Sequence, residues 1–259
     1  MPVLYAKHIV KIYAARKGAV PTKALAGVDI SVETGEFVGV MGPSGSGKTT
    51  LMNILSGIDR PMSGNVGIDG VEIARMTPDE LALFRRRKMG FVFQDFNLMD
   101  SLTLKENIML PMILDRKKAG EMESKAGEIM RMLDIADIAD KYPYEVSGGQ
   151  QQRCAVGRAL VNSPAVVFAD EPTGNLDSRS SGTVMKYFEK INEEKRATIL
   201  IVTHDPFAAS FCRRIIFLKD GAVSMEILRK GRRKEFFDKI LDCLAVLGGG
   251  NNDIQPGSI

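Results

Sequence analysis

Several residue types are scarce in this chain of 259 residues, which has no tryptophan, two histidines and three cysteines. The cysteines, Cys154, Cys212 and Cys243, stand apart and form no C-x-x-C pair, so they indicate reduced, packed thiols rather than a metal site. No run approaches the roughly 18 apolar residues that a membrane span needs. The net charge of +3 gives no electrostatic reason to expect a nucleic-acid partner. The first residues, MPVLYAKHIV, lack the layout of a signal peptide, so we expect a cytoplasmic chain.

The distribution of apolar residues predicts an α/β protein. Residues 36–41 (EFVGVM) are almost all apolar, as expected for a strand that is buried on both faces of a sheet. Further strands are expected at residues 4–10, 28–32, 165–169, 198–203 and 214–218. The segment 14–22 should be an exposed connection, and Asp69-Gly70 predicts a hairpin turn. Because apolar runs alternate with helical patterns, we expect a mainly parallel sheet.

Residues 95–164 have a different character, being rich in Met, Leu, Lys, Glu and Ala. Thr103 with Glu106 fits a helix-capping box, and residues 121–133 have the pattern of a helix. A further helix start is predicted at Thr77-Pro78-Asp79-Glu80. We therefore expect a helical subdomain inserted into the α/β core.

A glycine-rich turn after the strand at 36–41 carries the strongest motif. GPSGSGKT matches G-x-x-x-x-G-K-[ST], follows an apolar strand and opens a helix at residues 48–55. The glycines let backbone N–H groups wrap phosphates, Lys48 brings a positive charge to the β and γ oxygens, and the Thr49 hydroxyl can ligate Mg²⁺. The alternative is a glycine turn that caps a helix by chance. The nucleotide-binding residues expected here are Gly42, Pro43, Ser44, Gly45, Ser46, Gly47, Lys48, Thr49 and Thr50.

Two carboxylates follow the apolar strand VVFA. Asp170 ends that strand at the carboxyl edge of the sheet, where it can hold Mg²⁺ through water. Glu171 can then orient or deprotonate an attacking water molecule. Two ordinary surface carboxylates are the alternative. With the phosphate loop, this pair indicates a P-loop NTPase, and it leaves kinases, GTPases, helicases and transporter ATPases open.

A second glycine turn, VSGGQ at residues 146–150, opens a helix predicted at 150–161 and has no lysine. The order of phosphate loop, helical insert, Ser-Gly-Gly-Gln and Asp-Glu resembles the ATP-binding cassette (ABC) ATPases over roughly residues 3–225. Val146 stands where the family's signature motif usually has leucine. The resemblance implies that Ser147, Gly148, Gly149 and Gln150 contact nucleotide. For this stretch alone, the alternative is a Gly-Gly helix start without chemical consequence.

The resemblance assigns roles to other residues as well. Gln94, in FVFQDFNL, resembles the glutamine that reaches Mg²⁺ or water and couples the site to the membrane partner. His204, in IVTHD, resembles the histidine that contacts the γ-phosphate, although a lone histidine can also be structural. Asp177 would lie at a dimer seam, in a loop with Gly-Asn where many members have Ser-Ala. Tyr13 fits the aromatic residue that stacks on adenine, with a core or surface tyrosine as the alternative.

One phosphate loop and one signature motif imply that two copies pair head to tail, each signature capping the ATP of the other. The positive end of the helix behind Gly148 suits a γ-phosphate. The implied fold is α/β, a P-loop NTPase (RecA-like) core of mainly parallel sheet with an N-terminal antiparallel β subdomain and an inserted α-helical subdomain. The expected parts are the nucleotide-binding core at 1–94 and 165–225, the helical signature subdomain at 95–164, and a C-terminal extension at 226–259.

Longer stretches narrow the resemblance to one branch of the family. Three stretches resemble the branch that includes lipoprotein-release and macrolide-export ATPases. They are MGPSGSGKTTLMNILSGIDRPMSG, GFVFQDFNLMDSLTLKENIMLP and ADEPTGNLDS. HDPFAASFCRRIIFLKDG and the extension after it look like the bacitracin-type ATPases, which defend Gram-positive bacteria against peptide antibiotics.

This resemblance implies an ATP-hydrolysing, Mg²⁺-dependent subunit that drives a separate integral membrane permease at the cytoplasmic face of the membrane. Other readings are a lipoprotein-release or other mechanotransmission system, a soluble ABC ATPase of translation or DNA repair, and a small-molecule kinase.

The C-terminal extension begins with a basic run at residues 229–234 and continues as a helix at 235–247. One face of this helix is expected to carry Phe236, Phe237, Ile240, Leu241, Leu244 and Leu247. Glycines 248–250 should end it. This face either packs on its own core or the sister subunit, or meets the permease or the anionic inner leaflet.

Overall fold

A six-stranded sheet forms the centre of the computed structural model, which describes residues 2–14 and 21–248. Its strand order is β10-β9-β3-β8-β7-β6; the last five run parallel, and β10 is antiparallel to β9. The strands are β3 (Phe37–Met41), β6 (Met89–Val92), β7 (Val166–Asp170), β8 (Ile199–Val202), β9 (Arg214–Lys219) and β10 (Ala222–Leu228). The predicted α/β fold with a mainly parallel sheet is confirmed.

Strand β3 is buried on both faces, as its apolar sequence predicts. Phe37 and Met41 belong to the apolar cluster on one side of the sheet, and Val38 and Val40 belong to the cluster on the other side. Because successive side chains of a strand point to opposite faces, β3 joins the two halves of the core. The loop after β3 therefore starts from a strand that is buried on both faces.

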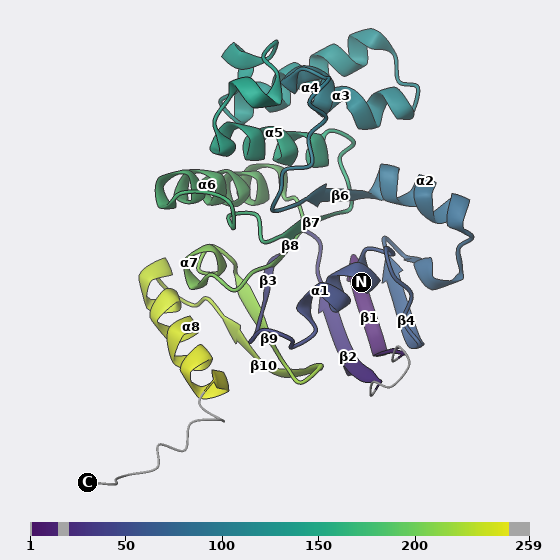
Figure 1. Ribbon diagram of the computed structural model, residues 1–259, viewed down its shortest axis with the longest axis vertical. Coiled ribbons are helices and arrows are strands. Elements are labelled where there is room, and N and C mark those ends of the chain that lie inside the picture. Colours follow the sequence, from purple (N-terminus) through teal and green to yellow (C-terminus); the bar gives the residue numbers. More distant parts are fainter. Residues whose placement is uncertain (1, 15–20, 249–259) are drawn as a thin grey trace, which may run out of the picture.

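A second, antiparallel sheet has the order β2-β1-β4-β5 and lies beside the core (Figure 1). Its strands are β1 (Leu4–Tyr13), β2 (Thr22–Val32), β4 (Ser63–Ile68) and β5 (Val71–Glu72). The predicted strands 4–10 and 28–32 were too short, because register shifts between β1 and β2 interrupt the alternation on which the prediction depends. Asp69 and Gly70 have φ angles of 52° and 76° and form the predicted hairpin turn. Of the expected exposed segment 14–22, residues 15–20 lie outside the described residues.

Helices of the core flank the six-stranded sheet (Figure 1). They are α1 (Lys48–Leu55), α2 (Pro78–Lys88), α6 (Ser178–Lys195) and α7 (Pro206–Ala209), with a short 3-10 turn at Ile73–Arg75. Helix α1 has the predicted bounds. Helix α2 begins as predicted, because Thr77 and Glu80 form a reciprocal capping box.

A group of helices lies beyond α6, at the top of Figure 1. It consists of α3 (Leu104–Leu114), α4 (Ala119–Met132), α5 (Gly148–Leu160) and 3-10 turns at Ala136–Ile138 and Pro143–Glu145. Thr103 and Glu106 form the predicted capping box of α3. Ile108, Met112 and Met130 are buried between these helices. The whole group is inserted between β6 and β7, as the change of composition predicts.

Helix α8 (Arg233–Gly248) packs against α7, at the end of the molecule away from α3 and α4 (Figure 1). Phe236, Ile240 and Leu247 are buried in the main apolar cluster. Leu241 was expected on the same face and is 43% exposed, because α7 covers a narrower stripe than the periodic pattern suggests. Among the helices within residues 2–14 and 21–248, none is both long and apolar enough to cross a bilayer.

Candidate active site

Four loops meet at the carboxyl edge of the parallel sheet. They follow β3, β6, β7 and β8, and they carry the phosphate-loop motif, Gln94, Glu171 and His204 respectively. Open α/β sheets bind ligands at this edge, because the loops after neighbouring parallel strands converge there. The fold therefore brings together residues that are far apart in the sequence.

The loop between β3 and α1 needs glycine for steric reasons. A Cβ atom added at Gly42 would lie 2.1 Å from the Leu218 carbonyl oxygen, and one added at Gly47 would lie 2.5 Å from that of Ala24. Gly47 also has a φ angle of 99°, in the left-handed region that other residues avoid. With these close contacts the backbone turns tightly in front of the first turn of α1, and a helix start of this kind presents N–H groups that can bind an anion.

Lys48 lies within the curve of this loop. Its Nζ donates hydrogen bonds to the carbonyl oxygens of Gly42 and Pro43, both at 2.9 Å. Burial lowers the pKa of the Lys48 ammonium, and the nearby Glu171 and Asp170 carboxylates oppose that shift. The buried Ser46 hydroxyl has no hydrogen-bond partner among the described residues. An ammonium group, the backbone N–H groups of a glycine turn and a partnerless hydroxyl are what a phosphate group would engage.

Glu171 is held by residues that follow β8. His204 Nδ1 lies 2.8 Å from Glu171 Oε1, the His204 backbone N–H donates to the same oxygen at 3.1 Å, and Thr203 Oγ1 donates to Oε2 at 3.1 Å. Because an ionised carboxylate only accepts hydrogen bonds, the ring contact places the proton of His204 on Nδ1. Sequence reasoning missed Thr203, although a polar residue closing an apolar strand beside a histidine is a readable signal.

Asp170 ends β7 close to Lys48. Burial raises the pKa of Asp170, the Glu171 carboxylate raises it further, and Lys48 opposes the increase. A partly buried carboxylate beside a second carboxylate gains from a divalent cation, because the metal offsets both charges. Thr49 at the start of α1 adds a hydroxyl oxygen to the same edge. This set of oxygen donors fits Mg²⁺.

Gln94 is joined to the loop after β7. Its Nε2 donates to Asn175 Oδ1 at 2.9 Å, and Asn175 Nδ2 donates to Asp95 Oδ1 at 2.7 Å. Asn175 is one of the two departures from the Ser-Ala pattern, and here it connects the two loops. Asp177 accepts hydrogen bonds from the backbone N–H groups of Arg179 and Ser180, and so caps α6.

The Ser-Gly-Gly-Gln turn forms the start of α5. Ser147 Oγ accepts from the Gln150 N–H, and the Ser147 backbone N–H donates to Gln150 Oε1 at 2.9 Å, which together form a reciprocal capping box. Gly148 faces Leu176 and Phe96, and Gly149 faces Ser180. The first-turn N–H groups of a helix lack partners within that helix. Within the described part of the chain, the close neighbours of both glycines belong to the loops after β6 and β7 and to the first turn of α6, rather than to residues 42–49.

Tyr13 lies at the end of β1, and its side chain is 41% exposed. Its hydroxyl donates to Asp59 Oδ2 at 2.9 Å, and Lys11 Nζ lies 5.0 Å from its ring centroid. The ring is thus held in place at the surface of the antiparallel sheet. This placement excludes the alternative of a core tyrosine.

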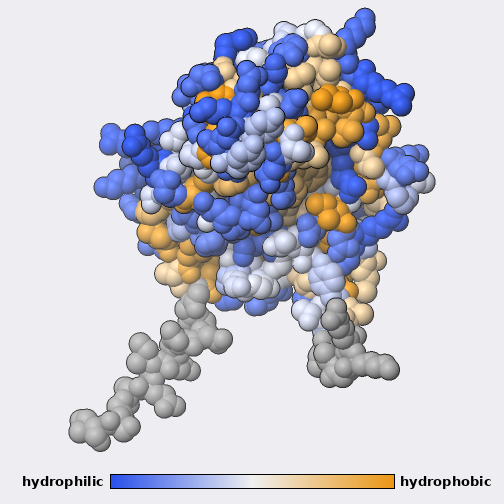
Figure 2. Space-filling model, turned by 45° about the horizontal axis from the view of Figure 1, so that its top comes forward, coloured by the Kyte–Doolittle hydropathy of each residue, from blue (hydrophilic) through white to orange (hydrophobic). Residues whose placement is uncertain are grey.

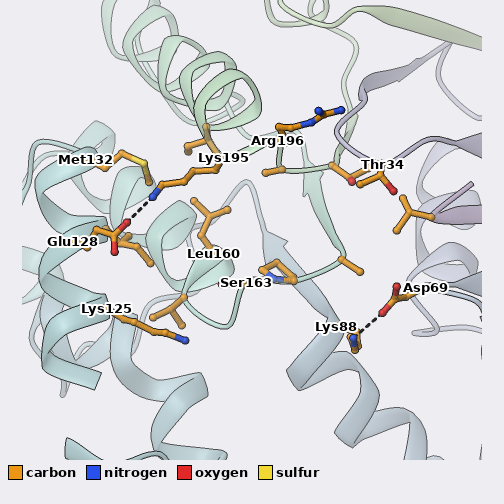
Figure 3. A pocket seen from close by; sticks show the side chains of 18 residues that line it. Thr34, Asp69, Lys88, Lys125, Glu128, Met132, Leu160, Ser163, Lys195 and Arg196 are labelled. Carbon is orange, nitrogen blue, oxygen red and sulfur yellow. Dashed lines mark hydrogen bonds and ion pairs between the residues drawn. The ribbon is translucent and has the colours of Figure 1, made fainter. Parts of the chain in front are cut away.

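Two cavities differ in their relation to this site. One of about 450 Å³ is lined by Glu171, Leu176, His204 and Phe207 among others, so it opens beside the catalytic candidates. Another of about 520 Å³ lies at the opposite, amino edge of the sheet. There Lys195 pairs with Glu128 at 2.6 Å and Lys88 with Asp69 at 2.7 Å (Figure 3). This second cavity is not lined by the phosphate loop, Glu171 or His204, so it is separate from the candidate active site.

The chain is similar to several known proteins. The family model described as ABC transporter matches residues 25–174. An uncharacterized ABC transporter ATP-binding protein of Bacillus subtilis, YvcR, is 53% identical, with 98% of each chain covered. The bacitracin export ATP-binding protein BceA of Halalkalibacterium halodurans is 47% identical, covering 98% of this chain and 100% of the relative.

A solved structure matches as well. It is the dimeric ATP-binding cassette MJ0796 in a post-hydrolysis state with ADP and phosphate, 41% identical, with a TM-score of 0.79 and coverage of 88% of this chain and 100% of that one.

Proposed function

This chain belongs to the ABC transporter family as an ATP-hydrolysing subunit, and we propose that two copies of it drive a separate membrane permease. One observation carries the proposal. Glu171, held by Thr203 and His204, shares the carboxyl edge of the sheet with Lys48. A carboxylate fixed beside a phosphate-binding loop is what activation of water for phosphoryl transfer requires.

Nucleotide binding is assigned to the loop of residues 42–49. The Lys48 ammonium exchanges its two carbonyl partners for phosphate oxygens, which are stronger acceptors because they are charged. Tyr13 offers its ring to the adenine. Thr49, Asp170 and Gln94 are the residues that would hold Mg²⁺, which when bound neutralises charge on the phosphates.

Hydrolysis is assigned to Glu171, which orients the attacking water and accepts its proton. In the structure described here, His204 occupies one oxygen of this carboxylate. We propose that the His204 ring turns to the γ-phosphate when nucleotide is present, which frees one acceptor position of Glu171 Oε1 for the water. A site completed by such a movement is active only in the closed state.

The α5 turn is assigned to the nucleotide of a second copy. Its glycines lie against residues 96, 176 and 180 of their own chain, and its outward N–H groups suit an anion. The dimeric state of the cassette MJ0796 supports this pairing. Each of the two sites would then combine the phosphate loop of one copy with Ser147, Gly148 and Gly149 of the other.

The permease is assigned to a groove between the core and the inserted helices. A cavity of about 370 Å³ opens there, lined by Phe93 and Asn97 on either side of Gln94 and by Leu110, Pro111 and Leu114 of α3. Leu114 is 54% exposed. Figure 2 shows apolar patches on an otherwise mainly hydrophilic surface on the face where the helical group comes forward. A segment docked in this groove would contact the loop that carries Gln94.

We assign the transporter to defence against peptide antibiotics. The support is the 47% identity to the bacitracin export ATP-binding protein over 98% of this chain, including α8. The chain would then lie at the cytoplasmic face of the membrane, held there by its permease.

A resistance assay tests this proposal. The chain and the permease encoded beside it are expressed together in a bacitracin-sensitive bacterium, and the minimal inhibitory concentration of bacitracin is measured. The expected result is a rise with the wild-type chain and none with Glu171→Gln, while both forms co-purify with the permease from membranes. Co-purification with ribosomes or DNA ends instead of a permease would contradict the transporter assignment.

A further inference from the structure

Gln152 lies in the second turn of α5, two residues after Gln150, and its side chain is completely buried. A buried amide is unusual, because it must satisfy donors and an acceptor away from water. Here Oε1 has no hydrogen-bond partner among the described residues, whereas Nε2 is fully used. An apolar side chain would fill the same space without an unpaired acceptor. Packing alone therefore does not account for this residue.

The two hydrogen bonds of Nε2 lead to the active site. One goes to the Phe93 carbonyl oxygen at 3.2 Å and the other to the Pro172 carbonyl oxygen at 2.6 Å. Phe93 directly precedes Gln94, and Pro172 directly follows Glu171. Because both partners are carbonyls, the amide nitrogen must face them, and both of its protons are engaged.

From this geometry we infer that Gln152 is a positioning residue, which fixes the loops of Gln94 and Glu171 to the helix that begins with Ser147. Strands β6 and β7 pair as far as Val92 and Ala169, and beyond that point no ladder holds the two loops together. Beyond the end of this ladder, the Gln152 amide connects the two loops by donating one hydrogen bond to each. Arg158, further along α5, donates to the Phe96 carbonyl oxygen at 2.9 Å and also to that of Asn97. Helix α5 thus holds the Gln94 loop on both sides.

This arrangement has a consequence in the head-to-tail pair, and to that extent it rests on the proposed function. The first turn of α5 would face the nucleotide of the partner subunit, while Gln152 holds the loops of its own site. A shift of α5 on closure is then passed directly to Glu171 and Gln94 of the same chain. Small misplacement of catalytic groups costs turnover far more than it costs binding.

Gln152→Glu, measured in the full-length chain, tests the inference. The substitution keeps the shape of the side chain and replaces the double donor with an acceptor that faces two carbonyl oxygens. Asn192→Asp is the matched control. Asn192 is 4% exposed, and its Nδ2 donates to the carbonyl oxygens of Gly35 and Ala197, both at 2.8 Å, at the opposite edge of the sheet. Both variants therefore lose the same kind of interaction, and one of them loses it next to the active site.

The expected result for Gln152→Glu is a fall in kcat of about tenfold or more with less than about threefold change in KM for ATP. Asn192→Asp should lower the melting temperature by about as much as Gln152→Glu does, and it should leave kcat within about twofold of wild type. If the buried carboxylate of Gln152→Glu prevents folding, Gln152→Met takes its place. Methionine has a similar length and no hydrogen-bond donor, so Gln152→Met should show the same loss of kcat. Equal kcat values for the two buried-amide variants, at equal stability, would overturn the inference.

A double-mutant cycle separates positioning from general stability. The loss of kcat caused by Gln152→Met should be smaller in a Gln94→Ala background, because one of the two groups that Gln152 positions is then absent. Additive losses would mean that Gln152 does not act through Gln94. Wild-type turnover and its abolition by Glu171→Gln are recorded in the same assay, so a failure of the ATPase assignment itself is seen independently.

Discussion

At the scale of single residues, Glu171 is the best-defined group of the site, because both of its oxygens accept hydrogen bonds from Thr203 and His204. Replacing Glu171 with Gln removes the proton acceptor and keeps the shape of the side chain. We expect Glu171→Gln to bind ATP normally and to lose turnover by about 100-fold or more. Phosphate release and equilibrium binding of a labelled ATP measure the two effects. Glu193→Gln, an exposed change on α6, is the control, and normal turnover in Glu171→Gln would remove Glu171 from its assigned role.

Lys48 should act on binding rather than on the chemical step alone. Its ammonium is held by the Gly42 and Pro43 carbonyl oxygens, and burial lowers its pKa, a shift that the Glu171 and Asp170 carboxylates oppose. Charged phosphate oxygens would bind this group more strongly than carbonyl oxygens do. We expect Lys48→Ala to weaken ATP binding by about tenfold or more, which corresponds to about 1.4 kcal/mol. Titration calorimetry measures it, with the exposed Lys186→Ala as control, and unchanged affinity would contradict the phosphate-loop assignment.

Sequence motifs identified Lys48, Glu171 and His204, because each carries its chemistry in its own residue type and its place after a strand. The same motifs could not identify Gln152, whose role depends on two backbone carbonyls that lie 59 and 20 residues away along the chain. Asn175 is a similar case, since its bridge between Gln94 and Asp95 depends on how two loops approach each other. Residues that act through backbone groups of distant segments leave no local pattern.

At the scale of elements, α8 is part of the core rather than an appendage. Ile240 of this helix is completely buried, whereas the adjacent Leu241 is 43% exposed. Arg233 adds a cation–π contact, with its guanidinium carbon 4.1 Å from the Phe211 ring centroid. We expect Ile240→Ala to lower the free energy of unfolding by about 2–5 kcal/mol, through lost burial and the cavity left behind.

Leu241→Ala is the matched control for this element, since it removes a similar side chain one residue further along. We expect it to change the free energy of unfolding by less than about 1 kcal/mol. Urea unfolding followed by circular dichroism measures both variants. Equal losses in the two variants would mean that α8 does not pack as described.

The elements themselves could be predicted well where local signals and the tertiary structure agree. The capping boxes at Thr77 and Thr103 and the Asp69-Gly70 turn depend only on residues close together in the sequence. They can therefore be predicted without knowledge of the tertiary structure. The lengths of β1 and β2 could not be predicted, because their register shifts depend on cross-strand pairing. Leu241 was misplaced for a related reason, since periodicity gives the direction of an apolar face and not its buried width.

At the scale of the whole molecule, the two glycine turns belong to different parts of the fold, the α/β core and the inserted helices. The turn before α1 is packed against Ala24 and Leu218, at the junction of the two sheets, whereas the turn before α5 starts a helix of the inserted group (Figure 1). Helix α8 lies far from that group. The proposed docking groove beside α3 and the proposed nucleotide site completed by a second copy would then use separate surfaces of the chain.

This separation predicts complementation between two inactive chains. Ser147→Arg places a bulky cation at the first turn of α5 and leaves the phosphate loop intact, so we expect normal ATP binding by the single chain and no hydrolysis. Lys48→Ala damages the phosphate loop and leaves α5 intact. If each site combines two copies, a mixture of the two variants forms one intact site per mixed pair. Random pairing then allows up to about a quarter of wild-type turnover, provided that the two sites act independently.

Steady-state ATPase measurements on each variant alone and on the mixture make this test. The exposed Ser224→Arg on β10 is the control for adding arginine to the surface, and it should retain turnover. Loss of ATP binding in Ser147→Arg would mean that α5 contributes to the site of its own chain. No activity in the mixture, with both variants folded and the wild type active, would contradict two independent sites that are each shared between two copies. Recovered turnover would mean that each site is shared between two chains. Neither variant hydrolyses ATP alone, and their two defects lie in different halves of such a shared site.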